Sequence, residues 1–129
     1  MRSAGDLREA CKVPIRCLIV DDNPAFLESA RRLLASEGVE IVGTASTCAD
    51  AIALAAETEP DVVLVDVELG DEDGFDLARR LARSAAATTV ILISTYPEAD
   101  VVDLMASNPA AGFIAKSSLS ARAVEAMLP

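Results

Sequence analysis

The sequence predicts a doubly wound α/β fold, in which helices cover both faces of a five-stranded parallel sheet. Short aliphatic runs rich in Val and Ile recur along the chain and are typical of buried strands in a parallel sheet. Segments with helical periodicity separate these runs, and each connection is long enough for a right-handed βαβ crossover. The chain has 129 residues, which is the usual size of a single domain.

Five segments are predicted to form the strands of this sheet. They are residues 16–20, 40–45, 62–65, 90–93 and 112–115. The third and the fourth are uninterrupted aliphatic runs, which indicates burial on both faces. The second carries Ile41 and Val42 as its best strand residues, so we expect it to be half buried.

The first helix is predicted from its boundary residues and from its periodicity. Asn23 is a good N-cap, Pro24 suits the first turn, and Gly38 suits the end of the helix. Its apolar residues recur on one face, which we expect to be buried. They are Phe26, Leu27, Ala30, Leu33 and Leu34.

The other connections are also predicted to be helical. Ser46 or Thr47 caps a second helix, which Pro60 ends. Its buried stripe is expected to consist of Ala49, Ile52, Ala53 and Ala56. The remaining predicted elements are an acidic loop at 70–73 and helices at 74–82, 99–106 and 120–128.

Composition excludes several classes of function. The net charge is −10, so this domain lacks the basic face that direct nucleic-acid binding requires. The chain contains no histidine, which excludes imidazole-based catalysis and histidine-ligated zinc on this chain. No apolar stretch approaches the roughly 20 residues that cross a bilayer, so no membrane association is expected.

Residues 1–14 are predicted to be an N-terminal leader, and residues 15–129 are predicted to be the folded domain. The leader contains several charged residues and no apolar signal core. The three cysteines are odd in number and form no C-x-x-C pair, a pattern typical of reduced thiols. We therefore expect a cytoplasmic protein.

Polar side chains follow four of the predicted strands at the point where each strand ends. Asp21 and Asp22 follow the first strand, and Asp66 follows the third. Ser94 follows the fourth strand, and Lys116 follows the fifth. Because open parallel sheets bind ligands beyond the carboxyl ends of their strands, we expect these five side chains to meet at one edge.

This group of side chains suits the transfer of a phosphoryl group. Three carboxylates in one cleft repel one another unless a cation neutralises them, and Mg²⁺ prefers oxygen ligands of this kind. Asp66 is then predicted to act as a nucleophile toward phosphorus. Lys116 would draw charge onto the transferred group, and Ser94 would donate a hydrogen bond to it.

Each of these residues also has a purely structural interpretation. Asp66 could be a strand-end aspartate that caps the loop after it, and Asp21 or Asp22 could cap the helix that begins at Pro24. Ser94 could cap the helix after Tyr96, and most lysines such as Lys116 are simply solvated. The sequence leaves these alternatives open for the residues taken singly.

With these residues identified, the chain resembles the receiver domain of two-component response regulators over about residues 15–128. In that family an acidic pair, a phosphorylated aspartate, a Ser or Thr and a Lys follow strands one, three, four and five. They are matched here by Asp21–Asp22, Asp66, Ser94 and Lys116. The Asp73–Gly74 pair also lies at the family's usual distance after the phosphoacceptor.

The resemblance implies a flavodoxin-like three-layer sandwich with strand order 2-1-3-4-5. It implies Mg²⁺ dependence, with Asp21, Asp22, Asp66 and the backbone carbonyl of Glu68 around the metal. Ser94 and Phe113 would be the switch residues, although a strand aromatic such as Phe113 could equally be part of the core. The family often has proline after the lysine, where this chain has Ser117; whether the Lys116–Ser117 bond is cis or trans stays open.

The partners follow from the same resemblance. A sensor histidine kinase or a histidine phosphotransfer protein would supply the phosphoryl group. The switch would act on an output domain or a target protein, and pairing with a second copy of the chain is a further expectation. Such a domain is a phosphoacceptor in signalling and not an enzyme that turns over a substrate.

Three other functions compete with this one. The first is a receiver-shaped interaction module that is never phosphorylated. The second is a phosphotransferase of the haloacid dehalogenase type, suggested by Asp66-Val67-Glu68, although the late acidic motif of those enzymes is absent. The third is a flavodoxin-like nucleotide or FMN binder, which needs a phosphate-binding loop where this chain has Asp21 and Asp22.

Overall fold

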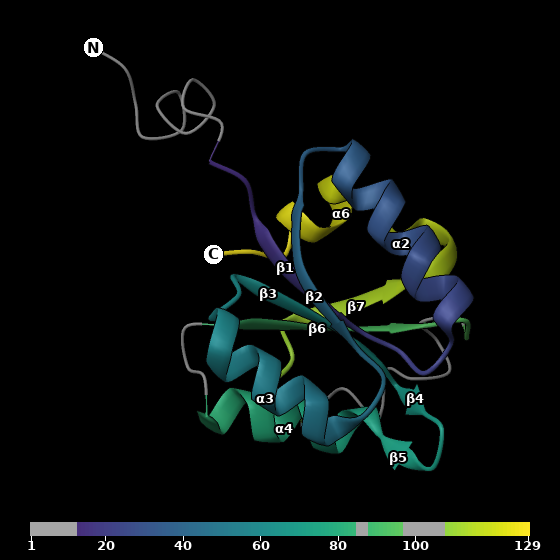
Figure 1. Cartoon of the computed structure of the whole chain (residues 1–129), viewed down its shortest axis with the longest axis vertical. Coiled ribbons are helices and arrows are strands. Elements are labelled where there is room, and N and C mark those ends of the chain that lie inside the picture. Colours follow the sequence, from purple (N-terminus) through teal and green to yellow (C-terminus); the bar gives the residue numbers. More distant parts are fainter. Residues whose placement is uncertain (1–12, 85–87, 97–107) are drawn as a thin grey trace.

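Five parallel strands form the middle layer of the computed structural model, which describes residues 13–84, 88–96 and 108–129 (Figure 1). The strands are β1 (Arg16–Val20), β2 (Glu40–Ala45), β3 (Val62–Asp66), β6 (Thr89–Ser94) and β7 (Gly112–Ala115). Their order across the sheet is β2-β1-β3-β6-β7, and each pair of neighbours is parallel. This confirms the predicted sheet and its order.

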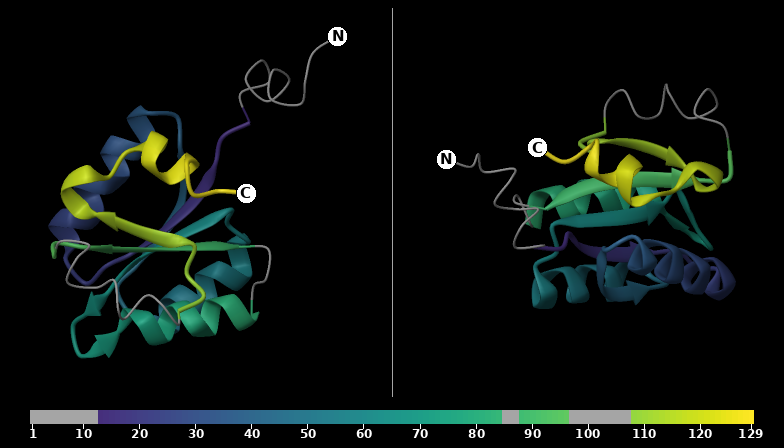
Figure 2. Two further views of the ribbon diagram at one scale, coloured as in Figure 1. Left: turned by 180° about the vertical axis from the view of Figure 1, so that it is seen from behind. Right: turned by 90° about the horizontal axis from the view of Figure 1, so that it is seen from above.

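Helices cover both faces of the sheet, as predicted (Figures 1 and 2). One face carries α2 (Pro24–Ser36) and the short α6 (Ala121–Glu125). The other face carries α3 (Cys48–Thr58) and α4 (Gly74–Ser84). The predicted helix at 99–106 and nearly all of the predicted leader lie outside the described residues. None of the helices in the described ranges has the length and apolar character of a membrane span.

The strands divide their side chains between two hydrophobic clusters by simple alternation. The cluster under α3 and α4 takes Leu18, Val20, Val63, Val65 and Leu92. The cluster under α2 and α6 takes Cys17, Ile19, Leu64, Ile91 and Ile93. All ten side chains are fully buried, which is why the strands read as continuous aliphatic runs and not as alternating ones.

The first helix begins as predicted, but the predicted burial of one of its apolar residues is wrong. Asn23 Oδ1 accepts hydrogen bonds from the backbone N–H groups of the first turn, and Pro24 occupies the first position. Gly38 follows the helix with φ of 92°. Leu33 was expected on the buried face but is 41% exposed, because the buried stripe runs through Ala30 and Leu34.

The predicted stripe of the second helix is wrong at its three alanines, whereas Ile52 is partly buried and packs against the cluster under α3 and α4 as expected. The residues of α3 that are buried are Cys48, Ala51 and Ala55, whereas Ala49, Ala53 and Ala56 are exposed. Thr47 is the cap, and its Oγ1 accepts a hydrogen bond from the backbone N–H of Asp50. Because alanine is small and occurs all round this helix, its positions carry little information about which face is buried.

The region predicted to be an acidic loop forms a small antiparallel hairpin. Its strands are β4 (Glu68–Leu69) and β5 (Glu72–Asp73), and Gly70 supplies a left-handed φ of 60° in the turn. Glu72 Oε1 accepts a hydrogen bond of 2.9 Å from the backbone N–H of Cys48, at the start of α3. One carboxylate of the acidic run is thus a helix cap contributed by a distant residue.

We expect Glu72→Ala to lower the free energy of unfolding by about 1 kcal/mol, which is the usual cost of losing a helix cap. Denaturant unfolding measures the loss. Asp71→Ala is the matched control, since Asp71 lies in the same hairpin and its side chain has no hydrogen bond or ion pair with another residue in the described part of the chain. Equal losses in the two variants would contradict a capping role for Glu72.

The chain after β7 differs in detail from its prediction. A 3₁₀ helix at Lys116–Ser118 comes directly after the strand. The last helix is shorter than the predicted 120–128, and Ser120 caps it by accepting from the backbone N–H of Ala123. The described residues contain no cis peptide bond, so the Lys116–Ser117 bond is trans.

Arg16 joins the amino ends of two strands to the end of a helix. Its guanidinium donates to the backbone carbonyls of Thr58 at 2.6 Å and Glu59 at 3.0 Å, at the C-terminus of α3. Its backbone N–H donates to the carboxylate of Asp61. Glu59 has a left-handed φ of 47°, and the Arg16 bond to its carbonyl helps to hold that conformation.

Candidate functional site

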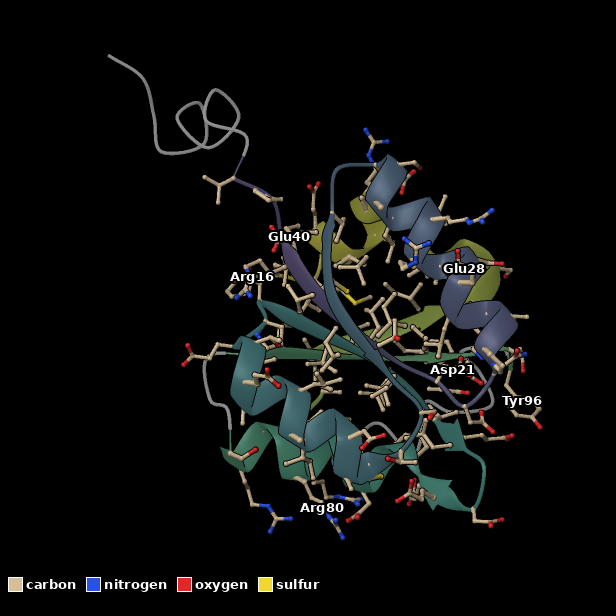
Figure 3. The ribbon with its side chains drawn as sticks, viewed as in Figure 1. Arg16, Asp21, Glu28, Glu40, Arg80 and Tyr96 are labelled. Carbon is tan, nitrogen blue, oxygen red and sulfur yellow. The ribbon has the colours of Figure 1, made fainter. Side chains whose placement is uncertain are left out.

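A polar pocket of about 320 Å³ lies beyond the carboxyl ends of the strands. The five residues predicted to converge all line it, together with four that complete its wall. The described residues that line it are Asp21, Asp22, Asn23, Asp66, Glu68, Gly70, Ser94, Thr95 and Lys116. Figure 3 shows Asp21 and Tyr96 at this end of the sheet, with Arg16 and Glu40 at the opposite end. The predicted convergence is therefore what the structure shows.

Asp66 ends β3 and is almost buried, at 6% exposure. Its Oδ1 accepts a hydrogen bond of 3.2 Å from the backbone N–H of Glu68, and its Oδ2 accepts one of 3.3 Å from Lys116 Nζ. Burial raises the pKa of Asp66 to about 6, and the charge of Asp21 adds to the rise, while Glu68 N–H and Lys116 oppose it. Burial thus leaves the Asp66 carboxyl group poorly solvated, which suits a nucleophile.

The acidic pair after β1 is divided between the interior and the pocket opening. Asp21 is fully buried, and its Oδ1 accepts a hydrogen bond of 2.8 Å from the backbone N–H of Asn23. Asp22 is exposed and lines the pocket. Neither makes the capping bonds to α2, which come from Asn23, so the structural alternative for the pair does not account for them.

The donor set fits a hard divalent cation. One carboxylate oxygen from each of Asp21, Asp22 and Asp66 lies within 4.8 Å of the others. Asp21 Oδ2 is buried and lacks a hydrogen bond of good geometry, although Lys116 Nζ lies 2.6 Å away as an ion-pair partner. Three carboxylates held this close together, one of them fully buried, are the arrangement that an oxygen-seeking cation satisfies.

Lys116 enters the pocket between two carboxylates and an aromatic ring. Its Nζ is 2.6 Å from Asp21 Oδ2 and 3.3 Å from Asp66 Oδ2. Burial alone would lower the pKa of Lys116, but its ion pairs with Asp21 and Asp66 and its hydrogen bond to Asp66 outweigh that effect and raise the pKa. The ammonium also lies 4.3 Å from the centroid of the Phe26 ring. Lys116 therefore carries its positive charge at any physiological pH.

Ser94 is buried at the end of β6, and the helix that it could alternatively cap lies outside the described residues. Ser94 Oγ accepts a hydrogen bond of 3.0 Å from the backbone N–H of Tyr96. As an acceptor in that bond, the hydroxyl keeps its own hydrogen to donate. The carboxylate of Glu68 raises the pKa of the Tyr96 phenol.

Phe113 lies in the core and is not one of the described residues that line the pocket. It is 8% exposed, lies opposite Leu92 in the sheet and packs in the cluster under α3 and α4. It is three residues before Lys116, so the two residues belong to the same short segment. A core position agrees with its structural interpretation, and a switch role stays a prediction.

Two neighbours of the site were not recognised as such from the sequence. Phe26 was assigned only to the apolar face of its helix. Gly74 was noted for its spacing, but its physical role was not: a Cβ at this position would lie 2.0 Å from the backbone carbonyl oxygen of Asp66. The Asp73–Gly74 pair was the sequence feature that could have indicated the close approach of Gly74 to Asp66. Nothing in the sequence indicated that Phe26 is a neighbour of Lys116.

Comparison with known proteins agrees with this geometry. The family model described as "Response regulator receiver domain" matches residues 17–128. The probable transcriptional regulatory protein NarL of Mycobacterium tuberculosis is 35% identical over 115 residues, covering 88% of this chain and 53% of that protein. The solved structure of the signal receiver domain of the putative NarL from the same organism superposes with a TM-score of 0.77 at 30% identity, covering 88% of this chain and 96% of that one.

Another relative is named as an enzyme and not as a transcriptional regulator. Protein-glutamate methylesterase/protein-glutamine glutaminase 5 of Myxococcus xanthus is 42% identical over 86 residues, which are 66% of this chain and 25% of that protein. The chain thus spans about a quarter to a half of the length of these curated relatives.

Proposed function

Because the chain belongs to the receiver domains of response regulators, we propose that it is a switch that accepts a phosphoryl group on Asp66. The donor is a sensor histidine kinase or a histidine phosphotransfer protein. The observation that supports this most directly is the convergence of Asp21, Asp66 and Lys116, with Lys116 Nζ within 3.3 Å of both carboxylates. A nucleophile, a second carboxylate and a fixed cation then share one pocket.

The transfer requires little from the protein beyond positioning and charge. A carboxylate oxygen of Asp66 attacks phosphorus, and the new P–O bond forms as the bond between phosphorus and the donor breaks. The leaving group keeps the bonding electrons. Lys116 neutralises charge that spreads onto the phosphoryl oxygens, and Ser94 donates its free hydroxyl hydrogen to one of them.

A divalent cation belongs to the same proposal. Asp21, Asp22, Asp66 and the backbone carbonyl of Glu68 would hold Mg²⁺, which supplies positive charge between the carboxylates and the incoming phosphoryl group. Asp21 acts from the buried side and Asp22 from the exposed side. The exposed position of Asp22 leaves room for exchange of the ion with solvent.

Phosphorylation would change the surface through charge. The acyl phosphate carries close to two negative charges, and these draw the Ser94 hydroxyl and the residues after it toward Asp66. We include Phe113 in this switch because it lies on β7, which pairs with β6 and leads into Lys116. The altered surface then acts on an output domain or a target protein, or pairs with a second copy of the chain.

The role is that of a phosphoacceptor in signalling and not of an enzyme with a released product. The chain corresponds to the receiver part of relatives whose full length is greater. We also propose a cytoplasmic location. The described cysteines, Cys17 and Cys48, are free thiols, which is compatible with a reducing compartment.

Incubation with acetyl phosphate and Mg²⁺, followed by intact mass measurement, tests the proposal. We expect a gain of one phosphoryl group in the unsubstituted chain, a loss of that gain with EDTA, and no gain in Asp66→Asn. Asp71→Asn is a matched control that removes a nearby carboxylate outside the pocket and should be phosphorylated normally. Borohydride reduction converts an aspartyl phosphate to homoserine, so peptide mapping identifies the modified residue.

Absence of any gain in the unsubstituted chain would contradict the proposal and favour an interaction module that is never phosphorylated. A gain that survives in Asp66→Asn and maps to another residue would also contradict it. Both results are distinguishable from misfolding if circular dichroism spectra of the variants match that of the unsubstituted chain.

A further inference from the structure

The Lys116 ammonium lies against the ring of Phe26, which belongs to an element that supplies no carboxylate to the pocket. The distance from Lys116 Nζ to the ring centroid is 4.3 Å. Phe26 is in the first turn of α2, is half buried, and packs against the cluster under α2 and α6. Phe26 is not among the residues that line the pocket, so its contact with the site runs through Lys116.

Three groups surround the ammonium, and they attract it in different ways. Asp21 and Asp66 attract it through opposite charge, at 2.6 Å and 3.3 Å. The ring attracts it through the negative face of its π-system, an interaction that strengthens where water is excluded. The Lys116 side chain is only 14% exposed, so water competes weakly. A long unbranched side chain is thereby held from several directions.

The position of Phe26 is itself linked to the site. Asn23 Oδ1 accepts hydrogen bonds from the backbone N–H groups of Ala25 and Phe26, at 2.9 Å and 3.3 Å. The backbone N–H of Asn23 donates to Asp21 Oδ1 at 2.8 Å. The helix cap, the buried carboxylate and the Phe26 backbone therefore form one connected unit, which fixes where the ring stands relative to Lys116.

The different attractions matter because Lys116 has two successive partners in the proposed reaction. Before transfer, the carboxylates hold the ammonium; after transfer, the phosphoryl oxygens attached to Asp66 compete for it. Attraction to a ring face does not depend on one acceptor atom, so the ring can hold the ammonium while its hydrogen-bond partner changes. A side chain of similar bulk without a π-face would fill the space and lose this attraction.

We propose that Phe26 is a positioning residue for phosphoryl transfer, whose ring holds the Lys116 ammonium over the pocket and shields it from water. This inference rests on the proposed function, because it concerns the rate at which Asp66 is phosphorylated. Phe26→Leu should slow phosphorylation by acetyl phosphate about threefold to tenfold, the range that the loss of one partly buried cation–π contact allows. Phe26→Tyr, which keeps the ring, should retain the rate.

The chain offers a direct readout of the contact that does not require phosphorylation. It has two lysines, Lys12 and Lys116, so protein labelled with ¹³C at the lysine Cε gives two proton–carbon signals. The ring current of Phe26 should displace the Lys116 signal upfield, and Lys12→Arg identifies which signal remains. We expect the displacement to vanish in Phe26→Leu and to persist in Phe26→Tyr. Phe75→Leu is the matched control, since Phe75 packs on the opposite face of the sheet.

The outcomes separate this inference from the proposed function. If the unsubstituted chain is phosphorylated, and Phe26→Leu keeps both the rate and the displaced signal, the role of Phe26 is wrong while the proposed function stands. A loss of rate in Phe26→Tyr as large as that in Phe26→Leu would also overturn it, because it would indicate a packing defect. No phosphorylation of the unsubstituted chain would contradict the proposed function itself.

Discussion

Gly74→Ala is expected to destabilise the fold by about 3 kcal/mol or more and to abolish phosphorylation of Asp66. An added Cβ would lie 2.0 Å from the backbone oxygen of Asp66 and 2.8 Å from its carbonyl carbon. These are backbone atoms, which cannot rotate away as a side chain can. The Gly74 N–H also donates a hydrogen bond of 3.1 Å to the carbonyl of Val67, the residue after Asp66. A shift of α4 away from Asp66 would break this hydrogen bond.

Denaturant unfolding and the acetyl phosphate mass assay together check this expectation. Gly43→Ala is the control, because the atoms nearest to a Cβ there would be side-chain atoms of Leu18 and Leu54, at 3.5 Å or more. It should cost far less and leave phosphorylation intact. If Gly74→Ala were as stable and as readily phosphorylated as Gly43→Ala, the close approach of α4 to Asp66 would not be a constraint on the site.

Lys116→Met is expected to slow phosphorylation of Asp66 about 100-fold, the usual effect of removing one preorganised donor from a transition state. Methionine keeps much of the apolar stem and removes the charge that lies 3.3 Å from Asp66 Oδ2. Loss of the Lys116 ammonium also leaves the buried Asp21 carboxylate without its ion-pair partner. We therefore expect a lower free energy of unfolding as well.

The rate of mass gain with acetyl phosphate measures the first effect, and denaturant unfolding with and without Mg²⁺ measures the second. We expect Mg²⁺ to restore more stability to Lys116→Met than to the unsubstituted chain, since the cation replaces the lost positive charge. Lys12→Met is the control, because it removes the only other lysine and the same unit of charge. Equal rates in the two variants would refute the role of Lys116.

The sheet and the polar site were predictable from sequence for the same physical reason. Strands buried on both faces must be aliphatic, so a residue such as Asp66 stands out at the point where the aliphatic run ends. Parallel strands in a doubly wound sheet bring such points to one edge. Asp21, Asp66 and Lys116 were therefore identified without any contact being known.

Contacts that depend on the phase of a helix or on a distant side chain were not predictable in this way. The buried stripe of α3 runs through Cys48, Ala51 and Ala55, and a helix rich in alanine gives no side-chain size from which to infer it. The Glu72 bond to the N–H of Cys48 joins residues 24 apart in sequence. The meeting of Phe26 and Lys116 likewise depends on how α2 lies against the end of β7, which periodicity does not specify.

Arg16 and Asp21, which lines the pocket, lie at opposite ends of the sheet (Figure 3). At the Arg16 end, backbone carbonyls of α3 and the Asp61 carboxylate are tied to β1 by direct hydrogen bonds. Substitutions in the pocket wall therefore leave these direct bonds between β1 and the end of α3 intact, so one end of the sheet can change shape while the other stays joined.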